Sequence, residues 1–288
     1  MSVYDIAFGT KRSVRTTIQK HMEWSEIVER LKDAHKTAET LEQYAAMTKA
    51  QRVDAKDIGF FIGGMATGRK VAYRQLLSLD IDEASDETLK TLREWLQGHA
   101  YIIHSTHSST PTEPRYRVVA PLNRIVIAEE YAAILRTLHE KFELPLDVAT
   151  FDFNRIMFLP SVPKDATYFF ESADGEPLDV SEIIGEGDSW RDLSGVDVPK
   201  KVQVQDPLLK GGIVGAFCKK YTIREAIATY LSDIWKPEPN GRYTLIGATT
   251  WGGGVIYEDK FLYSNHSSDQ FLGKCHNAYD AVRLYKFG

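Results

Sequence analysis

Two aspartates one residue apart are the strongest chemical signal in the sequence. The segment LLSLDID places Asp80 and Asp82 in an apolar run over residues 76–82, which is typical of a buried strand. Side chains alternate along a strand, so both carboxylates would lie on one face with Ser78. They would repel each other unless a cation neutralised them, and removing either one should leave the fold as stable or more so. The pair indicates either a Mg²⁺ or Mn²⁺ site, or acids that cap the helix expected from Ser85.

A second group of polar side chains follows in residues 101–122, YIIHSTHSSTPTEPRYRVVAPL. Ser105 and His107 lie two residues apart at the end of an apolar strand, which we expect to pair beside the strand of the two aspartates. Arg115 and Arg117 share a face of the strand that follows. Hydroxyl, imidazole and guanidinium groups that converge can bind a polyphosphate. The alternatives are an exposed loop histidine and the solvated face of an edge strand.

A third group lies in residues 144–161, LPLDVATFDFNRIMFLPS, where Arg155 stands eight residues after Asp147. Asp147, or else Asp152, could add a third carboxylate to the first pair. Three carboxylates suit the two-metal sites of polymerases and nucleases, in which the metal ions lie ~3.5–4 Å apart. Taken alone, Asp147 is typical of a turn that follows Pro145, so the two-metal interpretation depends on the other groups.

Helical and strand-like patterns indicate the elements that must position these side chains. Apolar residues at helical spacing predict helices near residues 24–31, 85–96 and 131–142. Short apolar runs predict strands at 58–62, 76–82, 100–105, 115–120 and 154–159. The two kinds of element do not alternate strictly, so we expect an α+β fold in which helices cover a sheet.

The length of 288 residues is more than one typical domain needs, and the pattern changes twice along the chain. Residues 1–170 hold all three polar groups and form the first expected domain. Residues 171–209 are acidic and rich in glycine and turn residues, so we expect a connector there. Residues 210–288 contain a capping-box pattern at Thr222 and Glu225, two strand patterns and a closing helix, which predict a small α+β domain.

The net charge of −5 conceals a separation of charge along the chain. Residues 165–209 hold eleven acidic and three basic residues, so the rest of the chain carries a charge of +3. Residues 66–79 and 114–124 contain three basic residues each and no acidic residue. Such segregation suits a basic groove for nucleic acid on an acidic protein, or an ordinary solvated surface.

The composition excludes several classes of protein. No apolar run approaches the ~18 residues of a membrane span, and the first residues lack the apolar core of a secretory signal, so we expect a cytoplasmic protein. Cys218 and Cys275 form no CxxC pair, which argues against a disulfide scaffold and against a zinc site. No GxxxxGK[ST] loop occurs in the chain, so we expect no helicase or ATP-motor activity in it.

The three polar groups, taken in order, resemble the motifs of the archaeo-eukaryotic primase superfamily: DxD, Ser-x-His, and Asp with an arginine eight residues later. The chain is most similar to the N-terminal primase region of virulence-associated protein E-type primase-helicases of phages and mobile elements. Flanking words such as HSTHS, PRYRVV and FNRIMFLPS agree as well, and the resemblance spans nearly the whole chain. It implies a primase-polymerase domain with a split, RRM-like mixed sheet, followed by an accessory domain.

The resemblance also implies an activity, namely a DNA primase and polymerase that joins nucleoside triphosphates on a single-stranded DNA template. The catalytic residues, which would bind two Mg²⁺ or Mn²⁺ ions, would be Asp80, Asp82 and Asp147. The nucleotide-binding residues would be Ser105, His107, Arg115, Arg117 and Arg155. Many primases carry zinc, but the cysteine spacing leads us to expect none here.

A setting and partners follow from the same resemblance. We expect replication of a phage or mobile element in the cytoplasm of a bacterial host, no membrane contact, and a helicase domain after these residues in a longer protein. The sequence does not choose between ribo- and deoxyribonucleotides. Three alternatives stay open: a non-catalytic replication-initiator module that only binds DNA, a two-metal nuclease, and a rolling-circle nickase. The spacing of His104 and His107 is one residue too long for the histidine pair of such a nickase.

Overall fold

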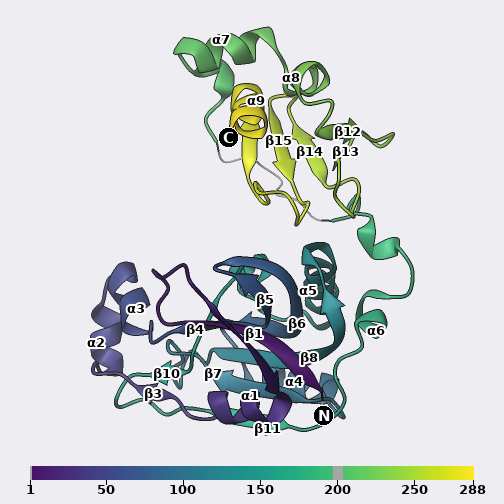
Figure 1. The fold of residues 1–288 in the computed structure, drawn as a ribbon. Helices are drawn as coiled ribbons and strands as arrows, with labels where there is room; N and C mark the ends of the chain where they lie inside the picture. The colour runs from purple at the N-terminus through teal and green to yellow at the C-terminus, as the bar shows by residue number, and fades with distance from the viewer. Residues whose placement is uncertain (1, 197–203) are drawn as a thin grey trace. The chain divides into compact units, whose positions relative to one another are not determined.

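The computed structural model describes residues 2–196 and 204–288, and the chain divides into two compact units, Met1–Gly185 and Glu186–Gly288 (Figure 1). Each unit combines helices with β-sheet, which confirms the expected α+β class. Within the described ranges, none of the helices is long and apolar enough to cross a bilayer.

A five-stranded sheet forms the centre of the first unit, with the order β11-β7-β8-β6-β5 and antiparallel neighbours throughout. Its strands are β5 (Gly64–Thr67), β6 (Lys70–Ile81), β7 (Tyr101–Ser105), β8 (Tyr116–Val126) and β11 (Phe170–Ala173). Leu76, Leu77, Leu79 and Ile81 are each at most 1% exposed, so the second half of β6 is buried on both faces. The expected strand at residues 76–82 therefore lies in the most buried part of the unit.

The order of the strands differs from our expectation, because β7 does not pair beside β6. β8 lies between them, and Arg117 of β8 pairs with Asp80 on one side and with His104 on the other. The reason is that β7 and β8 follow each other in the chain and form a hairpin, the commonest way in which consecutive strands pair. His104, Arg117 and Asp80 are thus neighbours in one row on one face of the sheet.

Helices cover one face of this sheet. α5 (Ala128–Phe142) packs on β6, and α6 (Val180–Ile184) packs on α5 and β8. The phenol of Tyr131 on α5 accepts a hydrogen bond from the backbone amide of Ser78 and donates one to the backbone carbonyl of the same residue. These contacts attach α5 directly to the strand that carries the two aspartates.

A second, smaller sheet and α1 (Trp24–Leu31) cover the opposite face. This sheet has the order β2-β1-β4-β9. Its strands are β1 (Val3–Gly9), β2 (Ile18–Glu23), β4 (Phe60–Ile62) and β9 (Met157–Phe158). The apolar core between the two layers includes Ile6, Leu31, Leu76, Ile102 and Val119. Asp80 lies on the same face of β6 as Leu76, so its carboxylate stands at the edge of an apolar core.

The remaining elements of the first unit are short. They are α2 (Leu41–Ala46), α3 (Lys49–Ala55), α4 (Asp86–Trp95), the 3₁₀ turn η1 (Val148–Phe151), and β3 (His35–Lys36), which pairs in parallel with β10 (Ser161–Val162). α2, α3 and α4 each begin with a capping box, at Thr40, Thr48 and Ser85 respectively. The helix expected from Ser85 is confirmed.

The first unit continues past residue 170, where we expected the connector to begin. β11 pairs with β7, and α6 packs on α5. Val180 and Ile184 are buried and hold α6 in place, although they lie in a segment whose composition is acidic. Composition predicted a connector because the acidic residues of this region outnumber the few apolar residues that pack. Residues 197–203 of the expected connector lie outside the described residues.

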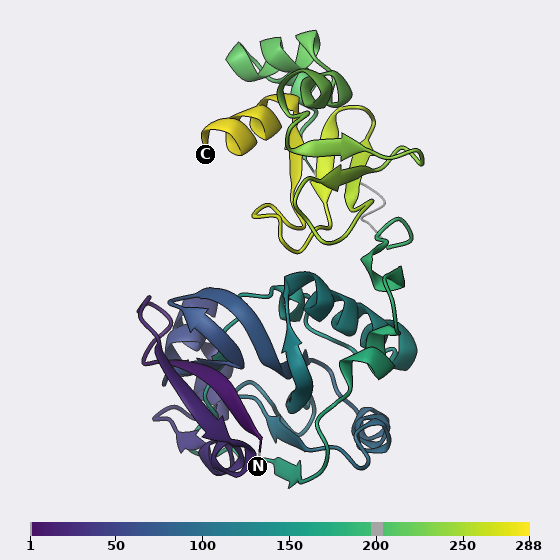
Figure 2. The ribbon, with the colours of Figure 1, turned by 45° about the vertical axis from the view of Figure 1, so that its right-hand side comes forward.

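The described residues of the second unit form a five-stranded antiparallel sheet in chain order, accompanied by three helices (Figure 2). Its strands are β12 (Trp235–Pro237), β13 (Tyr243–Leu245), β14 (Gly254–Tyr257), β15 (Phe261–Ser264) and β16 (Cys275–Asn277). Its helices are α7 (Gly212–Lys220), α8 (Ile223–Tyr230) and α9 (Ala278–Phe287), with 3₁₀ turns η2 (Ser189–Arg191) and η3 (Pro207–Leu209). The expected capping box at Thr222 and Glu225 is present and begins α8.

Arg74 of β6 is a fully buried arginine that fixes the loop after η1. Its Nε and Nη2 donate to the carbonyl of Phe153 at 3.0 and 2.7 Å, and Nη2 also donates to the carbonyl of Arg155 at 2.8 Å. The guanidinium lies 4.9 Å from the ring centroid of Tyr131. Carbonyl dipoles and aromatic faces therefore stabilise this buried charge, and the negative charge of Asp152 adds to their effect. The backbone that carries the Arg155 side chain is held by these bonds.

We predict that Arg74→Met lowers the free energy of unfolding by about 2–3 kcal/mol, because two buried carbonyls lose charged donors. Arg74→Lys should recover only part of this loss, since one ammonium cannot reproduce the planar fork of the guanidinium. Lys141→Met, at an exposed position of α5, serves as the control and should change the stability by less than about 0.5 kcal/mol. Urea unfolding followed by circular dichroism measures all three, and an Arg74→Met protein as stable as the wild type would contradict the assigned role.

Candidate functional site

Three carboxylates meet at the end of β6, and we call Asp80, Asp82 and Asp147 the acid cluster. The amide of Asp147 donates to the carbonyl of Asp80 at 2.9 Å, and the amide of Asp82 donates to the carbonyl of Pro145 at 3.0 Å. The segment before η1 therefore pairs with the end of β6 like an additional short strand. Backbone hydrogen bonds thus bring together the three aspartates that the sequence selected.

Asp80 is buried and forms a two-point ion pair with Arg117. The Arg117 Nε lies 2.7 Å from Oδ1 of Asp80, and Nη2 lies 3.2 Å from Oδ2. A third donor, Nη1 of Arg117, binds the carbonyl of Phe158 at 2.7 Å. Arg117, one of the two arginines expected to share a face, thus points towards the acid cluster and not towards solvent.

The other two carboxylates also face arginines. Nη1 of Arg115 lies 2.9 Å from Oδ1 of Asp82. Nη2 of Arg155 lies 3.2 Å from Oδ2 of Asp147 and 4.0 Å from Oδ2 of Asp80. Arg155 therefore stands between two members of the acid cluster, at the spacing of eight residues that the sequence indicated.

The two aspartates of the DxD motif have different electrostatic surroundings. Burial opposes ionisation of Asp80, but the charge and hydrogen bonds of Arg117 outweigh it and lower its pKa. Burial raises the pKa of Asp82, and the charges of Asp147 and Asp80 raise it further, against the opposing effect of Arg115. The expected repulsion between carboxylates thus acts on Asp82. Removal of Asp80 would relieve its repulsion with Asp82 but would also leave Arg117 buried without its partner, so we expect a loss of stability where the sequence led us to expect none.

The acid cluster has the donor chemistry that Mg²⁺ or Mn²⁺ requires, although in the described residues no three acidic, histidine or cysteine side chains are already arranged around a common metal position. Each carboxylate is instead occupied by an arginine. The side chains of Asp82 and Asp147 are 42% and 30% exposed, so a cation can reach them from solvent. The carboxylate oxygens of the acid cluster are suitable ligands for Mg²⁺ or Mn²⁺. Metal binding would require the arginines to release these carboxylates.

Lys56 is a fourth cation near the acid cluster, and the sequence analysis did not select it. Burial lowers its pKa, and the positive charges of Arg117, Arg155 and Arg115 lower it further, with Asp80 acting in the opposite direction. The Nζ atom lies 5.3 Å from the ring centroid of Phe158. A lysine in a turn before a strand carries no recognisable sequence signal, and only the fold brings Lys56 to this place.

Ser105 and His107 line a small cavity of about 40 Å³ together with Lys56 and Arg117. The hydroxyl of Ser105 accepts a hydrogen bond from the amide of Phe169 at 3.0 Å. The Nδ1 of His107 lies 2.8 Å from the Ser161 hydroxyl, and its Nε2 lies 3.0 Å from a carboxylate oxygen of Glu39. Both residues are therefore near the expected anion pocket, but their polar atoms are engaged within the protein.

His104 is the histidine that shares the row of Asp80 and Arg117. It is 1% exposed, and burial lowers its pKa to about 4, with the charge of Arg117 adding to this effect. Its Nδ1 lies 2.9 Å from the carbonyl of Ser105, and its Nε2 has no hydrogen-bond partner in the described part of the chain. His104 entered the sequence interpretation only through the histidine spacing of a nickase, and its place beside Arg117 follows from the position of β8 between β7 and β6.

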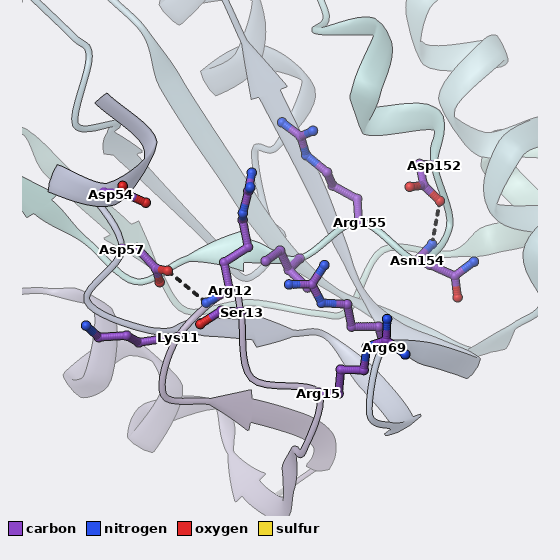
Figure 3. A pocket seen from close by; sticks show the side chains of 11 residues that line it. Lys11, Arg12, Ser13, Arg15, Asp54, Asp57, Arg69, Asp152, Asn154 and Arg155 are labelled. Atoms are coloured by element: carbon purple, nitrogen blue, oxygen red, sulfur yellow. Dashed lines mark hydrogen bonds between the residues drawn. The ribbon is translucent and has the colours of Figure 1, made fainter. Parts of the chain in front are cut away.

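Asp152, the alternative third carboxylate, lies outside the acid cluster. Its Oδ1 accepts a hydrogen bond from the amide of Asn154 at 2.9 Å, which caps the turn that leads to Arg155. Figure 3 shows Asp152 and Asn154 beside a larger cavity that Arg155 also lines. Of the two candidates, Asp147 is the one that the backbone brings to Asp80 and Asp82.

Cys218 and Cys275, on which the expectation of no zinc rested, belong to the second unit and are both free thiols. The Cys218 thiol is buried and lies 3.5 Å from Oδ1 of Asn277. His266 is also buried, with Nδ1 2.9 Å from the Thr250 hydroxyl and Nε2 3.1 Å from the amide of Leu245. The absence of zinc stays a prediction.

Comparison with solved structures finds two partial likenesses. The AEP domain of the primase-polymerase of cyanophage S-2L has 12% sequence identity and a TM-score of 0.36, over 56% of this chain and 94% of that chain. A primase, RepB′, has 12% identity and a TM-score of 0.34, over 64% of this chain and 56% of that chain. No curated protein matches the sequence.

Comparison with protein-family models gives a match that includes all of the candidate site. The model of the VapE N-terminal domain matches residues 2–198, which contain the acid cluster and the arginines that face it. The similarity to virulence-associated protein E that the motifs indicated is confirmed, and the chain belongs to the VapE N-terminal domain family.

Proposed function

We propose that this chain is a DNA primase-polymerase that makes primers on single-stranded DNA from nucleoside triphosphates. The observation that carries the proposal is the acid cluster at the end of β6, with four cations around three carboxylates. Carboxylates that hold divalent metal ions, next to cations that hold phosphates, are what nucleotidyl transfer requires. Membership of the VapE N-terminal domain family supports a role in replication priming.

In this proposal the acid cluster binds two Mg²⁺ or Mn²⁺ ions. Bound there, these ions would supply Lewis-acid stabilisation of the charge on the triphosphate and activation of the primer 3′-hydroxyl. Asp80, Asp82 and Asp147 supply the oxygen ligands. The ion pairs with these carboxylates keep the guanidinium groups close to the place where the triphosphate would bind, and the pairs would open when the metal ions bind.

The cations around the acid cluster bind the triphosphate. Arg117 and Arg155 would turn from carboxylate oxygens to phosphate oxygens, for which a planar fork of donors is equally suited. Arg115 and Lys56 add positive charge to the same place. Ser105 and His107 line the adjoining cavity, and His107 would contact a phosphate by exchanging its bond to Glu39 or Ser161.

We also propose that residues 210–288 form an accessory domain that holds template or the 5′ end of the new primer. A new dinucleotide pairs too weakly with the template to stay bound by itself, and a second contact would raise its effective concentration. The exposed lysines at the end of α7, Lys219 and Lys220, are suited to such a contact with phosphates.

We predict that Asp82→Asn lowers nucleotide incorporation on unprimed single-stranded DNA by at least about a hundredfold, because one metal ligand is lost. Asp82 is the sharper test than Asp80, since its pKa is raised by burial and neighbouring carboxylates, so an uncharged amide should leave the fold as stable as before. Glu83→Gln, one residue away and exposed, is the matched control and should retain activity.

The assay supplies Mn²⁺ or Mg²⁺ with each class of nucleotide and detects labelled oligomers. A folded Asp82→Asn protein that incorporates nucleotides at the wild-type rate would contradict the assignment of Asp82 as a metal ligand. Binding of DNA by the wild type without incorporation would favour a non-catalytic initiator module, and degradation of DNA without use of nucleotides would favour a nuclease.

To test the accessory domain, we propose a variant that ends at residue 185. We predict that its rate of primer initiation falls at least about tenfold more than its rate of extending a supplied primer. The supplied primer already has a stable duplex and does not depend on the second contact. Comparing the two reactions on the same template measures the difference. Equal losses in both reactions, from a protein that remains folded, would count against this role.

A further inference from the structure

A basic cleft lies next to the acid cluster, and apart from Arg155 the proposed function gives no role to the basic residues that line it. Its first part is a cavity of about 650 Å³ between the loop that joins β1 to β2 and the turn that precedes Arg155 (Figure 3). A second cavity of about 710 Å³ continues from it along the β5–β6 hairpin, and the two share Arg15 and Arg69. The basic side chains that line this cleft are Lys11, Arg12, Arg15, Arg69, Lys70 and Arg155.

The walls of the basic cleft are tied together by backbone contacts. Gly68 has φ +61°, and a Cβ atom there would lie 2.5 Å from the carbonyl of Arg15, so the hairpin and the loop approach each other closely. The amide of Arg12 donates to a carboxylate oxygen of Asp57 at 2.8 Å. The amide of Val71 donates to the Asn154 side chain at 3.0 Å. The walls of the cleft are therefore held in fixed positions by the fold.

Positive charge exceeds negative charge in the basic cleft, which six basic side chains and three carboxylates line. Lys11, Arg12, Arg15, Arg69 and Lys70 are exposed, and their side chains form no ion pair with any described residue. Two of the three carboxylates in the lining, those of Asp57 and Asp152, accept hydrogen bonds from backbone amides. Like charges gathered on tied walls repel one another, so an anionic ligand is the natural occupant.

The shape and lining of the basic cleft indicate which kind of anion it would bind. Two cavities in series fit an extended, repeatedly charged chain better than a single phosphate group. Among the described residues no aromatic side chain lines either cavity, so bases would find no surface for stacking, and contacts would fall on the backbone of the bound strand. Arg155 lines the cleft and also faces Asp147, so the occupant leads directly to the acid cluster.

We infer that the basic cleft binds the sugar-phosphate backbone of a DNA strand, without regard to sequence, and guides it to the acid cluster. This inference rests on the proposed function, because it takes the acid cluster as the place where the strand is used. Phosphate contacts of this kind position a strand but do not read its bases.

The test measures binding of a labelled single-stranded oligothymidine by fluorescence anisotropy between about 50 and 200 mM salt, with no metal or nucleotide present. We predict that Arg15→Ala/Arg69→Ala weakens binding about tenfold or more and reduces the slope of log K against log salt by roughly 1 for each side chain. Lys11→Ala/Lys70→Ala should act in the same direction. The matched control, Lys20→Ala/Lys141→Ala, removes two exposed charges outside the cleft and should bind like the wild type.

Binding is read without catalysis, so its outcome is separate from that of the proposed function. Loss of DNA binding in both cleft variants, from proteins with wild-type unfolding curves, supports the inference even if no synthesis is detected. Unchanged affinity and salt slope overturn it. A raised nucleotide requirement at saturating DNA, with unchanged DNA binding, also overturns it, because the cleft would then serve the triphosphate.

Discussion

The candidate site depends on one cross-strand ion pair, that of Asp80 on β6 with Arg117 on β8. Both side chains are buried at the edge of an apolar core, where neither charge could remain alone. Arg117 satisfies both oxygens of Asp80 and also binds the carbonyl of Phe158, so it joins the central sheet to the smaller sheet. To bind metal ions, Asp80 would have to exchange this ion pair for contacts with the metal, and Arg117 would need another anionic partner.

Buried arginines act as organisers in this fold in two different ways. Arg117 stabilises a carboxylate, whereas Arg74 stabilises two backbone carbonyls and thereby fixes the segment that carries Arg155. Arg155 then faces the acid cluster on one side and the basic cleft on the other. The sequence selected Arg117 and Arg155 as candidate nucleotide-binding residues, and it showed Arg74 only as part of a basic segment. In the structure Arg74 binds buried carbonyls, Arg117 pairs with a carboxylate, and Arg155 lines an exposed cleft. Composition does not distinguish these three environments.

Much of the acid cluster could be predicted because it follows local rules. Alternation along a strand placed Asp80 and Asp82 with Ser78. The spacing to Arg155 pointed to Asp147, with Asp152 as the alternative, and the structure brings Asp147 next to the DxD motif. His104 and Lys56 could not be found in this way. Their positions depend on which strands pair, and the position of β8 between β7 and β6 is a property of the whole sheet. The end of the first unit was missed for a related reason, since Val180 and Ile184 are too few to alter the acidic average.

The central claim is that the acid cluster is a two-metal site. The most direct measurement is anomalous X-ray diffraction from crystals that contain Mn²⁺ and a non-hydrolysable nucleoside triphosphate. The account predicts two manganese peaks ~3.5–4 Å apart, bound by Asp80, Asp82 and Asp147, with Arg117 released from Asp80. Crystals at saturating Mn²⁺ that show no manganese on these oxygens, and Arg117 still paired with Asp80, would contradict it.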